Sequence, residues 1–100
     1  MTTKMYHATD FANCISIAEK GLLKGIDSCV YCCNTAEDAA KFALVHGVKN
    51  ILVVTFEVDT DELHESFDHD QHFFGCRAWY VTRDISPEAL RGFTLFNVDQ

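Results

Sequence analysis

Hydrophobic and polar positions change their spacing several times along the chain, and each change marks a new structural element. Short runs rich in β-branched and aromatic residues predict β-strands at residues 4–8, 29–33, 50–58, 77–82 and 92–98. The run at 50–58, NILVVTFEV, is the longest of them and is apolar at successive positions. Because a strand with two apolar faces must be covered on both sides, we expect this strand to lie centrally in a sheet.

A first helix is predicted over residues 11–20, FANCISIAEK. Asp10 precedes it as a residue that can cap the free backbone N–H groups, and Gly21 follows it as a left-handed stop. Helical spacing places four residues on one face, namely Phe11, Cys14, Ile15 and Ala18. We expect this face to pack against the core.

A second helix is predicted over residues 36–46, AEDAAKFALVH, with Asn34 or Thr35 as its cap and Gly47 as its stop. Its alanines gather on one face, which consists of Ala36, Ala39, Ala40 and Ala43. Because small side chains allow a close approach, this helix is expected to lie near a sheet.

The remaining segments read as turns and loops. Residues 59–63 predict a turn or a single helical turn, and Ser86 with Pro87 predicts the capped start of another short helical turn. Residues 65–76, ESFDHDQHFFGC, read as a loop. The order of elements predicts one α+β domain over residues 1–100, with five or six strands and two helices.

Composition and charge narrow the classes of function. Apolar residues make up 48% of the chain and charged residues 23%, which are ordinary values for a globular domain. Eight basic residues against fifteen acidic ones give a net charge of −7, so duplex nucleic acid is not an expected partner. A small anionic cofactor in a local pocket is compatible with this balance.

The chain carries no pattern that predicts a targeting signal or a membrane span. Its five cysteines are an odd number with two adjacent members, a pattern that favours reduced thiols and a cytoplasmic location over a disulfide framework: Cys14, Cys29, Cys32, Cys33 and Cys76. Because Cys29 and Cys32 would point to opposite faces of a strand, we expect packed thiols rather than a zinc site.

The segment around residues 64–76 contains residue types that bind metal ions, but their spacing does not match a known metal-binding motif. Its candidate ligands are His64, Asp68, His69, Asp70 and His72. The step from His64 to His69 is five residues, whereas the zinc motif H-E-x-x-H needs four, and Phe73 stands where a calcium-binding loop needs glycine. The sequence therefore predicts no metal site, and it contains no glycine-rich phosphate-binding motif.

Several motifs, taken in order, resemble the ADP-ribosyltransferase-like fold family. They are MYHATD (5–10), ISIAEKGLLKG (15–25), CVYCC (29–33), TAEDAAKFA (35–43) and YVTRDISPEAL (80–90). Members of that family begin with a strand carrying Tyr-His-(Gly or Ala)-Thr and continue with a helix, a second strand bearing a tyrosine, and a capped helix with small residues. The resemblance implies a small split β-sheet and a site for NAD or an ADP-ribose-containing ligand.

The resemblance also implies roles for four residues of this chain. His7 matches the histidine that hydrogen-bonds the ribose hydroxyl beside the nicotinamide. The backbone of Ala8 matches the position that holds the nicotinamide carboxamide, with Thr9 beside it. Tyr31 matches the tyrosine that stacks on the nicotinamide ring or shapes its pocket. The ligand is expected between the first two strands.

The expected catalytic acid is missing from its usual place. Cleavage of the nicotinamide–ribose bond builds positive charge on the sugar, which an anion must stabilise. Where many transferases carry a glutamate, this chain has Arg77 and Ala78. Asp68, or less favourably Asp70, is the substitute that we expect, with His69 beside it, in a loop that folds over the pocket as a lid.

Other interpretations of the same residues stay open. The activity implied is that of a transferase or an NAD glycohydrolase. A domain without the usual acid could equally serve as a non-catalytic nucleotide binder, or as an inhibitor-like module whose acidic surface binds a basic protein target. A third interpretation is an oligomer assembled through the edge of the strand at 92–98.

Overall fold

The structure is a computed structural model that describes residues 1–25, 29–66 and 78–97. Two helices and six strands follow one another in the described residues, with a short 3₁₀ turn at three places. The elements are β1 (Thr2–Asp10), η1 (Phe11–Asn13), α1 (Cys14–Lys20), β2 (Val30–Cys32), α2 (Ala36–Val45), β3 (Asn50–Asp59), η2 (Thr60–Glu62), β4 (His64–Ser66), β5 (Ala78–Val81), η3 (Pro87–Ala89) and β6 (Leu90–Asn97).

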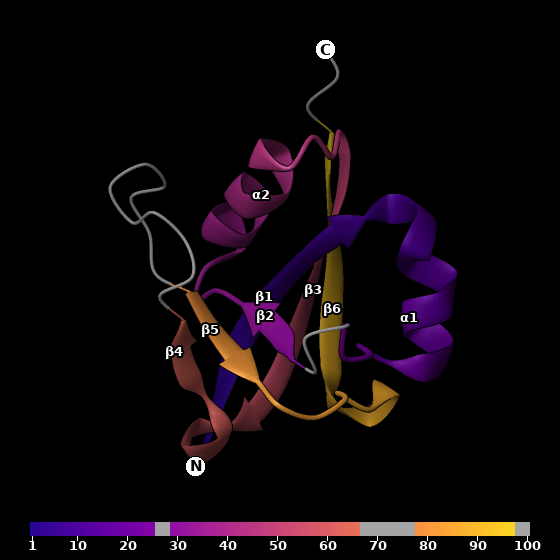
Figure 1. Ribbon diagram of the computed structural model, residues 1–100. Helices are drawn as coiled ribbons and strands as arrows, with labels where there is room; N and C mark the ends of the chain where they lie inside the picture. The colour runs from indigo at the N-terminus through magenta and orange to yellow at the C-terminus, as the bar shows by residue number, and fades with distance from the viewer. Residues whose placement is uncertain (26–28, 67–77, 98–100) are drawn as a thin grey trace.

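The strands form two small antiparallel sheets, with the orders β1-β3-β6 and β2-β5-β4 (Figure 1). One isolated bridge between Tyr6 and Cys33 joins β1 to the end of β2. The α+β class with two helices is therefore confirmed. The strand that the sequence did not predict is β4, which begins at His64 and takes Glu65 and Ser66 out of the expected loop. The rest of that loop lies outside the described residues.

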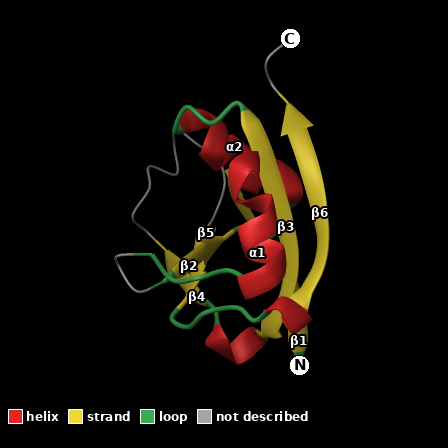
Figure 2. Cartoon of the chain, turned by 90° about the vertical axis from the view of Figure 1, so that its right-hand side faces the viewer, coloured by secondary structure: helices red, strands yellow, loops and turns green. Residues whose placement is uncertain are grey.

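The central strand was predicted correctly. β3 lies between β1 and β6, and the helices α1 and α2 pack on opposite sides of it (Figure 1), with the α1 side facing the viewer in Figure 2. On one face Leu52 and Val54 contact the cluster that contains Ile17 of α1. On the other face Ile51 and Val53 pack with the alanines of α2. The apolar run of β3 thus reflects burial on both sides.

The helix α2 has the cap, the buried alanines and the terminating glycine that the sequence predicts. The side chain of Thr35 accepts a hydrogen bond from the backbone N–H of Asp38 at 3.1 Å, as a helix cap does. Ala39 and Ala43 are buried against the sheet. Gly47 ends the helix with a φ of 87°, a conformation that suits a residue without a side chain.

The face predicted for the first helix is wrong. The buried residue of α1 is Ile17, whereas Ile15 is 75% exposed. The predicted cap is present, because Asp10 accepts a hydrogen bond from Ala12, but the first residues form the 3₁₀ turn η1. A 3₁₀ helix has three residues per turn, whereas an α-helix has 3.6. The helix face that is counted from Phe11 with α-helical spacing is therefore displaced in α1.

Gly21 ends α1 with a positive φ of 81°, as predicted, but its ψ of −165° is extended rather than left-handed helical. This conformation directs the chain into a bridge between Leu22 and Ile85, whose backbone groups exchange bonds of 2.9 and 2.8 Å. A Cβ atom at Gly21 would lie 1.9 Å from the carbonyl oxygen of Ile85. Glycine is therefore required here for both its backbone and its size.

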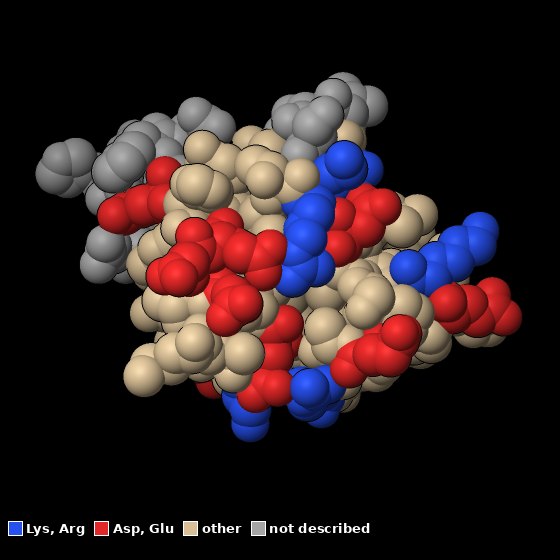
Figure 3. Space-filling view, turned by 90° about the horizontal axis from the view of Figure 1, so that it is seen from below, with Lys and Arg blue, Asp and Glu red and all other residues tan. Residues whose placement is uncertain are grey.

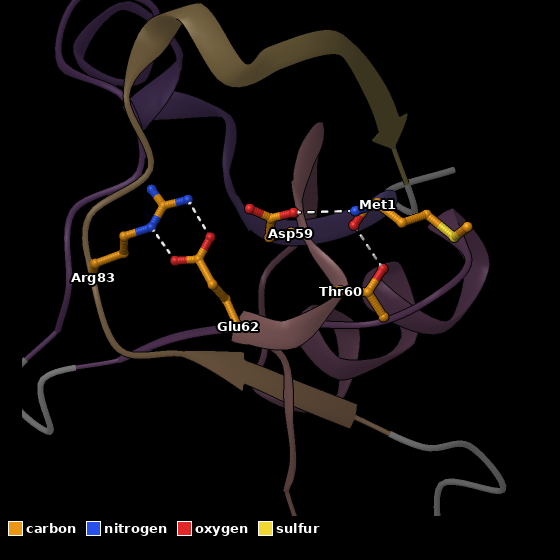
Figure 4. Close-up of polar contacts among 5 residues, drawn as sticks. All are labelled: Met1, Asp59, Thr60, Glu62 and Arg83. Carbon is orange, nitrogen blue, oxygen red and sulfur yellow. Dashed lines mark hydrogen bonds and ion pairs between the residues drawn. The ribbon is translucent and has the colours of Figure 1, made fainter.

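Polar contacts fix the turn η2 beside the start of β1 (Figure 4). The carbonyl of Met1 accepts hydrogen bonds from the backbone N–H of Thr60 at 2.9 Å and from its hydroxyl at 3.1 Å. Arg83 donates to both carboxylate oxygens of Glu62, and this hydrogen bonding lowers the pKa of Glu62. The segment after β5 is thereby tied to the turn before β4.

β6 begins at Leu90, earlier than predicted, and lies at the edge of its sheet, paired with β3 among the described strands. Phe93 and Leu95 are exposed on it. The sheet edge expected near residue 92 is therefore present.

Candidate functional site

The two sheets separate at the junction of β1 and β2. Tyr6 and Cys33 exchange both backbone hydrogen bonds, with N–O distances of 2.9 and 2.8 Å. In a continued antiparallel ladder, the next residues to exchange bonds would be Ala8 and Tyr31. Within the described part of the chain no such bridge forms between them. The ladder between β1 and β2 thus stops after one pair.

The imidazole of His7 takes the hydrogen bond that would continue this ladder. Its Nδ1 lies 2.7 Å from the carbonyl oxygen of Tyr31. Because a carbonyl can only accept, the proton of this bond resides on Nδ1. In a regular ladder that carbonyl would accept from the N–H of Ala8. A side chain from the neighbouring residue has therefore replaced the backbone of Ala8.

The backbone of Ala8 is left with a donor and an acceptor that point away from β3. Backbone groups of successive strand residues alternate in direction, and those of Tyr6 point toward β2. The N–H and C=O of Ala8 must point to the same side. Neither group has a hydrogen-bond partner among the described residues. One donor and one acceptor side by side are complementary to a primary carboxamide.

His7 is neutral in this position. Burial lowers the pKa of its imidazole, and the hydrogen bond to Tyr31 opposes that shift only in part. With the proton on Nδ1, the neutral ring carries a lone pair on Nε2. His7 is partly exposed, and Nε2 has no hydrogen-bond partner among the residues that the structure describes. Nε2 can therefore accept a hydrogen bond from a hydroxyl group.

The predicted site residues His7 and Tyr31 are in contact through the backbone carbonyl of Tyr31, but their side chains lie on opposite faces of the strands. The ring of Tyr31 packs across the strands on Tyr80, with centroids 6.0 Å apart, and Tyr80 in turn stacks on His64 at 5.2 Å. Successive strand side chains alternate, so His7 lies on the opposite face, the face of Cys32. Tyr31 therefore contacts His7 through its carbonyl rather than through its ring.

Thr9 lies on the same face as His7, two residues further along β1. Its hydroxyl oxygen accepts a hydrogen bond of 2.8 Å from the side chain of Asn13. This bond ties the end of β1 to the start of α1. The hydroxyl proton of Thr9 remains able to donate.

Asp68 and His69, which the sequence suggested as catalytic groups, lie outside the described residues, as does Arg77. In the described ranges no cluster of three or more His, Cys, Asp or Glu residues is arranged to hold a metal ion. Burial raises the pKa of the Cys32 thiol to about 12, so this thiol is protonated at neutral pH. Cys32 acts here as a small apolar residue.

Sequence reasoning missed the strand β4 and with it Glu65. The strand has three residues, which is too short for a hydrophobic pattern to stand out. In the structure Leu63 packs on the core, and Glu65 follows it on the same face.

The surface charge is mainly negative. Seen from below, Asp and Glu side chains form several patches among uncharged residues, with Lys and Arg between and beside them (Figure 3). Two of the arginines are engaged by acids, Arg83 by Glu62 and Arg91 by Glu57. On this face the basic side chains lie next to acidic ones, an arrangement that does not favour binding of a polyanion.

Comparison of the sequence with models of known protein families finds no match, and a search of curated protein sequences also finds none. Across the described residues, no helix has both the length and the apolar character needed to span a membrane.

Proposed function

We propose that this protein binds NAD or an ADP-ribose-containing ligand at the junction of β1 and β2. The observation that carries the proposal is the backbone of Ala8, which directs an N–H and a C=O, without partners among the described residues, to the side where β2 departs. A nicotinamide carboxamide presents the matching acceptor and donor. The N–H of Ala8 would donate to the amide oxygen, and its C=O would accept from the amide nitrogen.

His7 supplies the second contact. Its neutral ring would accept a hydrogen bond at Nε2 from a hydroxyl of the ribose next to the nicotinamide. The bond from Nδ1 to Tyr31 fixes the ring, so little conformational entropy is lost when the ligand binds. Thr9 lies on the same face and offers its hydroxyl proton. Tyr31 contributes by holding His7 with its carbonyl.

The architecture supports an ADP-ribosyltransferase-like fold for this domain. The domain has two antiparallel sheets, which are joined by one backbone bridge, and two helices. This arrangement agrees with the split sheet that the sequence motifs imply. His7 and Ala8 lie at the point where the sheets part. The implied reaction is transfer of ADP-ribose or hydrolysis of NAD, in which the protein orients the ribose and holds the leaving nicotinamide.

A binding module without catalysis is the second candidate. The net charge of −7 and the acidic patches in Figure 3 favour it, because excess negative charge suits association with a basic protein. In that case the junction would bind nucleotide alone, or the acidic face would serve as an inhibitor-like surface.

Calorimetry with NAD, ADP-ribose and nicotinamide tests the proposal. Wild type is expected to bind NAD, and His7→Ala to bind it at least about 10-fold more weakly, which corresponds to one lost hydrogen bond of about 1.4 kcal/mol. His46→Ala is the matched control, because the Nδ1 of His46 also bonds a backbone carbonyl, that of Phe42, at 2.7 Å. Equal affinities of wild type and His7→Ala, or no heat with any of the three ligands, would contradict the proposal.

A further inference from the structure

The backbone of β6 directs hydrogen-bonding groups to the free edge of its sheet. Backbone groups of successive strand residues alternate in direction, and those of Tyr6 in β1 point away from β3, toward Cys33. Counting this alternation across β3 by the two registers makes Thr94 of β6 bond to β3. The N–H and C=O groups of Phe93 and Leu95 therefore point outward, where they have no partner among the described residues.

The side chains of the same two residues are exposed. Phe93 pairs with Val54 and Leu95 pairs with Leu52, and both partners belong to the core cluster on the α1 side of the sheet. Because directly opposite residues point to the same side, Phe93 and Leu95 also lie on the α1 side. They are 42% and 53% exposed, and in Figure 2 β6 stands clear of α1 at the right-hand edge of its sheet. Outward backbone groups and exposed apolar side chains thus occur together on β6.

Residues 92–97, GFTLFN, lack the features that usually protect an edge strand from pairing, which are charged side chains, proline and bulges. The register shift of β6 falls before this segment, between Leu90 and Gly92. The charged residue of the strand, Arg91, donates a hydrogen bond of 2.8 Å to Glu57 of its own chain. A charged partner would gain no ion pair along residues 92–97, so this uncharged strand matches an uncharged strand such as itself.

We propose that two copies of this chain pair antiparallel through β6, with a two-fold axis at Thr94. Phe93 of one copy then exchanges backbone hydrogen bonds with Leu95 of the other, and Thr94 lies opposite Thr94 of the other copy. The two sheets β1-β3-β6 become one continuous sheet. The junction of β1 and β2 lies at the other edge of each sheet, so this inference does not depend on the proposed ligand.

The side chains fit this register on both faces of the continuous sheet. On the α1 side, Phe93 and Leu95 of one copy lie opposite Leu95 and Phe93 of the other, so that four exposed apolar side chains form one cluster. On the α2 side, Phe96 lies opposite Gly92 of the other copy. A Cβ atom at Gly92 would meet nothing within 4 Å, so there is space for an aromatic ring to cover this glycine.

The size of the contact and the charge of the chain make this a weak dimer. Standard interfaces bury about 800 Å² per partner, and one pair of short strands with four apolar side chains buries less. Each copy has a net charge of −7, so the copies repel each other and added salt should strengthen the dimer by screening. We expect a dissociation constant of about 100 µM, which leaves dilute protein monomeric.

Sedimentation equilibrium over concentrations from about 5 µM to about 1 mM tests the association. Wild type is expected to change from monomer to dimer over this range. Leu95→Lys introduces a charge into the apolar cluster and is expected to raise the dissociation constant at least about 10-fold. Ile15→Lys is the matched control, because it makes a similar change at a residue of α1 that is 75% exposed, and it should associate as wild type does. Circular dichroism checks that both variants fold.

Thr94→Cys tests the position of the two-fold axis. Thr94 would form a non-hydrogen-bonded pair with its own copy, in which the Cα atoms lie about 4.5 Å apart, within the range of a disulfide. With diamide as the oxidant, this variant should form a covalent dimer at least about 10-fold faster than Leu44→Cys, whose site on α2 is 48% exposed. Wild type treated in the same way accounts for the native cysteines.

Each contrary result overturns the inference in its own way. Wild type that stays monomeric at about 1 mM would leave the edge of β6 to a strand of another protein. Equal dissociation constants for wild type and Leu95→Lys would locate the contact elsewhere on the chain, and weakening by salt would identify a contact between charges. Species that grow beyond a dimer would mean unspecific association. Cross-linking of Thr94→Cys no faster than that of Leu44→Cys would exclude the two-fold axis at Thr94.

Discussion

Gly21→Ala is expected to lower the free energy of unfolding by about 4 kcal/mol, the sum of backbone strain and overpacking that each cost about 1 to 3 kcal/mol. The strain arises because Gly21 has a φ of 81° with an extended ψ, a combination that side chains do not tolerate. The overpacking arises because the new methyl group would lie 1.9 Å from the carbonyl oxygen of Ile85. To relieve that contact, the bridge between Leu22 and Ile85 must open.

Gly47→Ala is the matched control for this prediction. Gly47 also has a positive φ, of 87°, but a Cβ atom there meets nothing within 4 Å. We expect it to cost about 1 kcal/mol, the price of the left-handed backbone alone. Urea denaturation followed by circular dichroism measures both variants. Equal midpoints for Gly21→Ala and Gly47→Ala would show that the close contact with Ile85 is not a feature of the folded protein.

Phe56→Ala is expected to lower the free energy of unfolding by about 4 kcal/mol. Phe56 lies in β3, is fully buried, and is among the largest side chains in the core cluster on the α1 side of the sheet. Its removal leaves a cavity in this cluster, to which β1, β2 and the segment before η3 also contribute side chains. Small domains have only about 5 to 15 kcal/mol of stability, so this loss is a large fraction of the total.

Phe93→Ala provides the comparison for Phe56→Ala. Phe93 lies on the edge strand β6 and is 42% exposed, so its truncation is expected to cost about 1 kcal/mol. Thermal and urea unfolding of the two variants measure the difference. A loss at Phe93 as large as the loss at Phe56 would mean that the face of β6 is covered in solution. That result would support an oligomer assembled through this strand.

The sequence predicted the elements whose patterns are long. β3 and α2 each have 10 residues. Over such lengths a continuous apolar run, as in β3, or a period of 3.6 residues, as in α2, is visible. β4 has three residues, so no period could reveal it. The face of α1 was predicted wrongly because the 3₁₀ turn at its start changes the number of residues per turn. Local patterns therefore fixed the class of fold but not every face.

The candidate site could be predicted only in part, for a different reason. His7, Ala8 and Tyr31 were named from motifs, but the bond between His7 and the carbonyl of Tyr31 joins residues 24 positions apart. Such a contact depends on the register between strands, which cannot be determined from local sequence patterns. The backbone groups of Ala8, which have no partner among the residues that the structure describes, follow from the same register. The separation of the Tyr31 ring from His7 also follows from it.

The most direct measurement of the central claim is the amide resonance of Ala8 in ¹H–¹⁵N spectra during a titration with NAD. Because that N–H has no partner among the described residues, a carboxamide oxygen that accepts from it should shift the resonance downfield. Nicotinamide should cause the same shift, whereas ADP-ribose, which lacks the carboxamide, should not. A saturating shift at Ala8 with NAD and nicotinamide is the predicted result. An Ala8 resonance that does not move while NAD is present in excess would contradict the account.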